Sequence, residues 1–89
     1  MTNAEIAGVF VDIGARLRAK KDNIFKIRAY EKAAKAIEGW PAPVEQLSRE
    51  SRLREIPGIG DAIEKKITEL VSTGRLEYYE RLKAEKDSI

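Results

Sequence analysis

Apolar residues recur at helical spacing in the N-terminal half of the chain. In its first segment they fall on one face of a helix: Ile6, Val9, Phe10, Ile13 and Leu17. Thr2 and Glu5 have the spacing of a capping box, in which each side chain accepts a hydrogen bond from the other residue's backbone N–H. We therefore predict a helix from Asn3 to Ala19.

A second helix is predicted from Ile24 to Glu38, with Asn23 as its N-cap and Gly39 after its last turn. Two faces of this helix differ in character. The apolar face carries Ile27, Tyr30, Ala34 and Ile37, and a basic stripe carries Arg28, Lys32 and Lys35. We expect Trp40 to pack at the edge of the core, with base stacking as the alternative.

The remaining residues predict shorter helices. The expected elements are a short helix or turn around Val44–Leu47 and helices at Arg49–Glu55, Asp61–Thr73 and Leu76–Lys86. Asp61 is expected to cap its helix and Gly74 to end it. No run alternates polar and apolar residues as a strand does. The sequence thus predicts an all-α bundle of four or five short helices, forming one domain over residues 1–89 with a helix-hairpin-helix at about 49–73.

The candidate hairpin is the run Ile56-Pro57-Gly58-Ile59-Gly60, directly before the amphipathic helix that begins at Asp61. Its two glycines permit a turn that other residues resist. The start of the following helix presents unpaired N–H groups and a partial positive charge, which suit a phosphate. We predict that Gly58, Ile59 and Gly60 contact the DNA backbone; the alternative is a plain turn between helices that binds nothing.

Composition narrows the possible chemistry. The chain has no cysteine and no histidine, which excludes thiolate metal sites and catalysis by serine–histidine or cysteine–histidine pairs. The net charge is only +2, but residues 16–35 hold eight basic and two acidic residues, a local charge of +6. Such a block can follow a phosphate backbone, although it is also typical of solvated helix faces. With neither a membrane span nor a signal peptide in the sequence, we expect a cytoplasmic monomer, associated with the nucleoid in a bacterium or archaeon.

Four stretches carry a resemblance to a known family: residues 23–34, 56–60, 66–69 and 72–76. In these stretches the chain resembles the N-terminal domain of the family X DNA polymerases, which carries 5′-deoxyribose-phosphate lyase activity. The resemblance implies a role in DNA repair and a preference for gapped, nicked or 5′-phosphate-bearing DNA. Lys66 lies where the family has the lysine that forms a Schiff base with an abasic sugar. We expect Lys65 to lower the pKa of Lys66. We also expect the stem of Lys66 to be partly covered and its amine to lie near Tyr30, whereas Lys65 should stand farther out in solvent.

The resemblance also implies further site residues. Lys26 and Tyr30 match family positions near the 5′ phosphate and the nucleophile, and Arg54 keeps the positive charge of another. The full set of expected DNA-binding residues is Lys26, Arg28, Tyr30, Lys35, Arg54, Gly58, Ile59, Gly60, Lys65 and Lys66. Backbone carbonyls of Arg54, Ile56 and Ile59 are expected to bind a potassium or sodium ion that bridges to a phosphate.

Several positions depart from the family pattern. Phe25 stands where the family has a histidine that stacks on a base, and Ala62 and Tyr78 replace two phosphate-binding lysines. Glu64 occupies a position where the motif often has alanine, and it would repel phosphate if it faced the DNA. The chain ends where the polymerase portion of the family begins, so we expect no polymerase activity from these residues.

Three functions therefore remain after the sequence analysis. The favoured one is a DNA-binding module that recognises the phosphate backbone without sequence specificity. The second is an abasic-site lyase that acts through Lys66. The third is a protein-interaction adapter that kept the fold and lost DNA binding.

Overall fold

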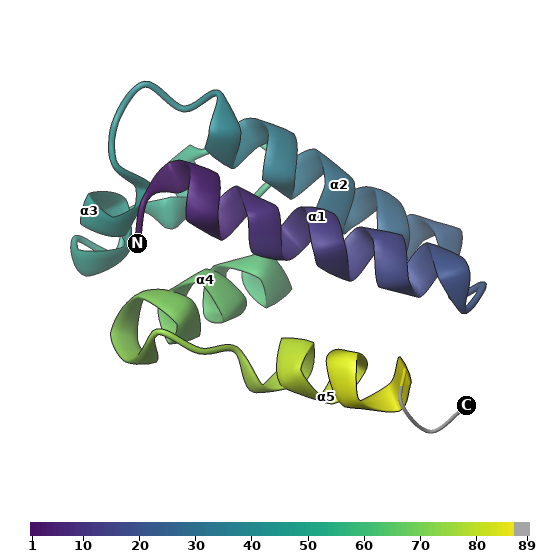
Figure 1. The fold of residues 1–89 in the computed structure, drawn as a ribbon. Coiled ribbons are helices and arrows are strands. Elements are labelled where there is room, and N and C mark those ends of the chain that lie inside the picture. The colour runs from purple at the N-terminus through teal and green to yellow at the C-terminus, as the bar shows by residue number, and fades with distance from the viewer. Residues whose placement is uncertain (87–89) are drawn as a thin grey trace.

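The computed structural model describes residues 1–86, and these residues form helices and connecting turns with no strand. The elements are α1 (Asn3–Ala19), α2 (Ile24–Glu38), α3 (Val44–Arg49), the short 3₁₀ helix η1 (Leu53–Glu55), α4 (Asp61–Thr73) and α5 (Glu77–Lys86). Figure 1 shows α1 and α2 side by side and antiparallel, with α4 and α5 in a layer beneath them and α3 close to the N-terminus. The predicted all-α bundle is confirmed.

Local capping explains where the long helices begin and end. Thr2 and Glu5 form the expected capping box: the Glu5 N–H donates to Thr2 Oγ1 at 3.1 Å, and the Thr2 N–H donates to Glu5 Oε1 at 2.8 Å. Asn23 caps α2 by accepting from the Phe25 N–H at 2.8 Å. Gly74 ends α4 in the left-handed conformation, with φ of 77°. These three sequence predictions are confirmed.

The predicted helix over Arg49–Glu55 is wrong. Instead, α3 runs to Arg49, and the chain turns through Ser51, which has a left-handed φ of 58°. The turn is closed by a hydrogen bond of 2.8 Å from the Arg52 N–H to the Leu47 carbonyl, which satisfies the end of α3. The first helix of the hairpin motif is thus α3 followed by η1, rather than one continuous helix.

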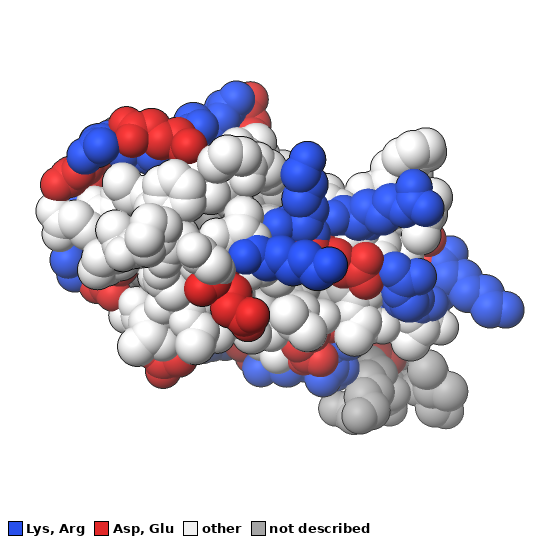
Figure 2. Space-filling model, turned by 90° about the horizontal axis from the view of Figure 1, so that it is seen from above, with Lys and Arg blue, Asp and Glu red and all other residues white. Residues whose placement is uncertain are grey.

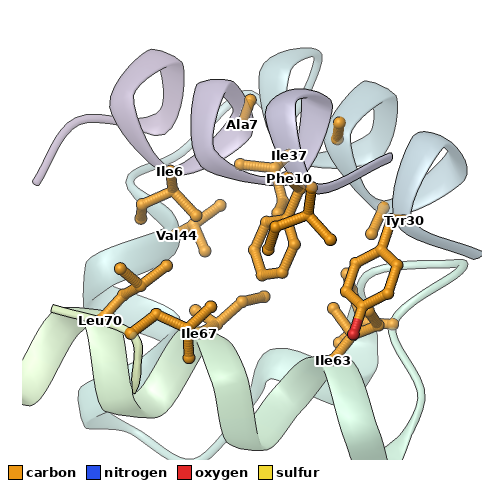
Figure 3. Packing of buried hydrophobic residues seen from close by; sticks show 14 of the residues in the cluster. Ile6, Ala7, Phe10, Tyr30, Ile37, Val44, Ile63, Ile67 and Leu70 are labelled. Carbon is orange, nitrogen blue, oxygen red and sulfur yellow. The ribbon is translucent and has the colours of Figure 1, made fainter. Parts of the chain in front are cut away.

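The core lies between the α1–α2 pair and α4 (Figure 3). Phe10 is fully buried, and its ring stacks on Tyr30 with centroids 5.9 Å apart. The face of α4 that closes the core carries Ile63, Ile67 and Leu70, as its periodicity predicts. Burial of each such side chain contributes about 1.5–3 kcal/mol. Trp40 packs against the edge of this core, as expected.

Asn3 fixes the connection between α2 and α3. Its side-chain nitrogen donates to the Ala42 carbonyl at 2.9 Å and to the Trp40 carbonyl at 3.4 Å, and its oxygen accepts from the Val44 N–H at 2.8 Å. Since Val44 is the first residue of α3, this contact sets the position of the hairpin motif against α1.

Polar contacts hold α5 against α1. The Tyr79 hydroxyl donates to Asp12 Oδ2 at 2.5 Å, and Arg16 Nε donates to the same oxygen at 2.9 Å. The Tyr79 hydrogen bond, followed by Arg16, lowers the pKa of Asp12. Among residues 1–86, no helix has both the length and the apolar character that a membrane span requires.

Candidate functional site

The hairpin turns its backbone outward because its apolar side chains point inward. Ile56 and Ile59 are 1% and 5% exposed, and the Ile59 N–H donates to the Ile56 carbonyl at 3.1 Å. Gly58 lies between them with φ of 95°, a conformation that glycine adopts without strain. The result is a tight turn whose exposed surface is the backbone around Gly58 and Gly60. Ile59, predicted as a binding residue, offers only its main chain.

The start of α4 has no side-chain cap. Gly60 is the N-cap residue, with φ of −99° and ψ of −175°, and a Cβ added there would have no atom within 4 Å. The first helical hydrogen bond runs from the Glu64 N–H to the Gly60 carbonyl at 2.9 Å, so the backbone amides before Glu64 precede the helical ladder. The prediction that Asp61 caps the helix is wrong, because its carboxylate pairs with Arg54 instead.

Arg54 faces carboxylates at the mouth of the hairpin. Its guanidinium forms an ion pair with Asp61 and lies 3.9 Å from Glu64 Oε1. It therefore compensates two acidic side chains near the start of α4, one of which is Glu64, the residue expected to repel phosphate if it faces the DNA. Arg54 remains a predicted DNA contact, and its observed partners are these two carboxylates.

Lys26 and Lys66 meet at one aromatic ring. Lys66 Nζ lies 4.9 Å from the centroid of Tyr78, and Lys26 Nζ lies 5.4 Å from the same centroid. Tyr78 in turn stacks on Tyr30, with centroids 6.1 Å apart. The Tyr78 hydroxyl oxygen is buried and has no hydrogen-bond partner among the described residues. We call Lys26, Lys66 and Tyr78 the lysine–tyrosine cluster.

Burial lowers the pKa of Lys66, and the nearby charge of Lys26 lowers it further, while Glu69 opposes both. From the sequence we expected the charge of Lys65 to lower this pKa. Lys65 is exposed, and the charge that lowers the pKa is that of Lys26. The predicted half-burial of Lys66 and exposure of Lys65 are confirmed. The aromatic ring beside the amine is that of Tyr78 of α5, which itself stacks on Tyr30.

Tyr30 itself is a core residue with only 4% exposure. In Figure 3 its side chain points from α2 towards α4, near Ile63. Burial, followed by the neighbouring Tyr78, raises the pKa of the Tyr30 hydroxyl. Its place in the site is therefore beneath the lysine–tyrosine cluster, where it supports Tyr78, and a direct contact with DNA is not available to it in this conformation.

The cations of α1 and α2 differ in how they are compensated. Arg18 of α1 forms two hydrogen bonds with Glu31, at 3.0 and 2.9 Å, and Lys20, the C-cap residue of α1, pairs with Glu85 at 2.5 Å. On α2, the stripe of Arg28, Lys32 and Lys35 is exposed and has no carboxylate within 4.0 Å among residues 1–86. Figure 2 shows the surface formed by α1 and α2. Lys and Arg side chains gather over the half of this surface that holds the end of α1 and the start of α2.

Two further features lie beside these cations. Phe25 precedes Lys26 and is 77% exposed, so its ring is free to stack on a planar ligand. No group of three or more histidine, cysteine or acidic side chains in the described part of the chain could hold a metal ion. Of the backbone carbonyls expected to bind a cation, that of Ile56 already accepts one hydrogen bond and keeps a second lone pair.

A family model described as a helix-hairpin-helix domain matches residues 1–76. The matched residues include the hairpin, the basic stripe of α2 and Lys66, whereas Tyr78 lies beyond them. No curated protein matches the chain.

Proposed function

Since the chain belongs to the helix-hairpin-helix domain family, we propose that it binds the phosphate backbone of DNA through the exposed turn at Gly58 and Gly60. Domains of this family generally bind DNA without sequence specificity. The observation that carries the proposal is the uncapped start of α4, where glycine leaves the first amides open to an incoming anion.

The unpaired cations of α2 support this proposal. Phosphate contacts position a protein on DNA but carry no sequence information, and each one releases condensed counterions. A stripe of three uncompensated cations on α2 can supply such contacts in addition to those of the hairpin. Paired cations such as Arg18 would first have to give up their carboxylates.

Binding to labelled duplexes of unrelated sequence, measured by fluorescence anisotropy over a range of salt concentrations, tests the proposal. We expect similar affinities for all sequences and a fall of log K with log salt of about 0.9 for each phosphate contacted. No salt-dependent binding to any DNA would refute it and would favour the adapter function.

We also propose, from the resemblance to family X polymerases, that the preferred DNA is gapped or nicked with a 5′ phosphate and that the protein serves in DNA repair. The lysine–tyrosine cluster supports this proposal, because two ammonium groups that converge on one ring suit a dianionic terminal phosphate. Gapped duplexes that differ only in a 5′ phosphate or a 5′ hydroxyl are the matched probes. Equal affinity for both would contradict the preference.

A second candidate function is abasic-site lyase chemistry at Lys66, favoured by the lowered pKa of its half-buried amine. The neutral amine would add to the C1′ aldehyde of an abasic sugar and lose water to give an imine. Loss of a C2′ proton would then break the C3′–O bond and release the phosphate-terminated strand. Hydrolysis of the imine would restore the free lysine.

Borohydride trapping on an incised abasic duplex tests the lyase function. Lys65 is the matched control, since it lies one position away on α4 and is exposed. We expect Lys66→Ala to abolish the trapped adduct and Lys65→Ala to preserve most of it. Because the pKa of Lys66 is lowered from 10.5, trapping should reach half its maximum rate below that pH. Equal trapping by both variants would refute the assignment.

A further inference from the structure

One residue of the basic stripe lies against the hairpin. A Cβ built on Gly58 would lie 3.3, 3.4 and 3.6 Å from Cγ, Cε and Cδ of Lys32. The aliphatic stem of Lys32 therefore lies beside Gly58, on the side towards which a Cβ would project. Its ammonium group, one bond beyond Cε, is held near the mouth of the hairpin.

Nothing in the described part of the chain neutralises that ammonium. Lys32 has no ion pair there, whereas the other cation near the hairpin, Arg54, is engaged by Asp61 and Glu64. The acidic side chains at the start of α4 are thus compensated by one residue, and Lys32 remains available to an anion that approaches Gly58.

We propose that Lys32 binds the same DNA phosphate as the hairpin amides, so that α2 and the hairpin form one composite phosphate site. This inference rests on the proposed function. It assigns the contact to Lys32 in particular, a residue from an element distant in the sequence from the motif.

The neighbours of Lys32 on the stripe do not share its position. Lys35 lines a groove between α1 and α2 together with Val11 and Ala15, which places it towards α1. Arg28 precedes Lys32 by one helical turn, towards the start of α2. The three side-chain atoms nearest to a Cβ built on Gly58 all belong to Lys32.

A double-mutant cycle with Gly60→Ser tests whether Lys32 and the hairpin share a phosphate. Lys32→Met keeps an aliphatic stem over Gly58 and removes the charge, and Lys35→Met is the matched control on the same stripe. We expect Lys32→Met to reduce DNA affinity about fivefold and to reduce the salt slope by about 0.9. In the Gly60→Ser background its effect should shrink to about twofold or less, because residues that share a partner are not additive.

The control separates this inference from the proposed function. Lys35→Met should weaken binding by the same factor with or without Gly60→Ser, because the two sites are independent. Full additivity of Lys32→Met with Gly60→Ser would refute the composite site and leave the hairpin function intact. If none of the variants loses affinity for DNA, the proposed function itself is refuted. Thermal unfolding of each variant checks that the fold is retained.

Discussion

Replacement of Gly60 by serine should make the protein more stable and weaken its binding to DNA. The position has an extended backbone that any residue can adopt, and a Cβ there meets open space. Serine is a favoured N-cap residue, and its hydroxyl would accept a hydrogen bond from an amide in the first turn of α4. That amide is one of the donors that we assign to the DNA phosphate.

The two effects have different sizes and opposite signs. A glycine replacement at a compatible position stabilises by about 0.4–1 kcal/mol, because it restricts the unfolded chain, and the serine cap adds a few tenths. For a domain of this size, about 1 kcal/mol raises Tm by about 4–8 °C. Loss of one charge-assisted hydrogen bond costs about 1.5–3 kcal/mol, so DNA affinity should fall at least tenfold.

Circular dichroism during heating measures the first effect, and fluorescence anisotropy with a labelled duplex measures the second. Gly58→Ser is the contrasting control. At φ of 95° a side chain is strained by about 1–3 kcal/mol, so this variant should lose both stability and binding. Wild-type affinity of Gly60→Ser would refute the assignment of the hairpin amides to phosphate, and a lowered Tm would refute the capping argument.

Three further predictions concern the fold and the ion. Asn3→Ala should lower the free energy of unfolding by about 1–3 kcal/mol in urea titrations, because it leaves the Val44 N–H without its partner; a loss below about 0.5 kcal/mol would show that water replaces the side chain. Asp12 has a lowered pKa, so its contribution to stability is present above the unfolded value of 3.8 and is lost as the pH falls through the folded value. Asp12→Asn should therefore destabilise the protein at pH 7, and this loss of stability should shrink as the pH falls below 3.8; a loss that stays constant as the pH falls would contradict this. Replacing potassium with a bulky organic cation at equal ionic strength should weaken DNA binding if backbone carbonyls such as that of Ile56 hold an ion, and unchanged affinity would exclude it.

The sequence predicted those parts of the fold that depend on neighbours in the chain. The caps at Thr2 and Asn23 and the apolar stripes of the long helices are local patterns, and the structure confirms them. The turn after α3 was missed because Ser51, and not glycine, adopts its left-handed conformation. The inward positions of Leu53 and Ile56 fit a short 3₁₀ turn as well as a continuous helix, so their spacing could not distinguish the two.

In the candidate site, too, the features that depend on local sequence were predicted and the contacts between distant segments were not. The exposed hairpin turn and the half-burial of Lys66 follow from local periodicity and were predicted. The contact of Lys32 with Gly58 and the placement of Tyr78 over two lysines join segments far apart in the sequence. No alternation or spacing encodes such pairs, and the lowered pKa of Lys66 was for that reason attributed to the wrong neighbour.

Because Tyr78 lies on α5, the residues of the candidate site come from two parts of the chain. The hairpin, the basic stripe and Lys66 all lie within residues 1–76, whereas the ring over which both ammonium groups lie comes from the helix that follows. Amino-acid changes confined to α5 can therefore alter the ring contact of the Lys66 amine while the hairpin stays the same. The proposed chemistry at Lys66 and the proposed phosphate contact at the hairpin thus depend in part on different helices, α5 for the ring and α4 for the backbone amides.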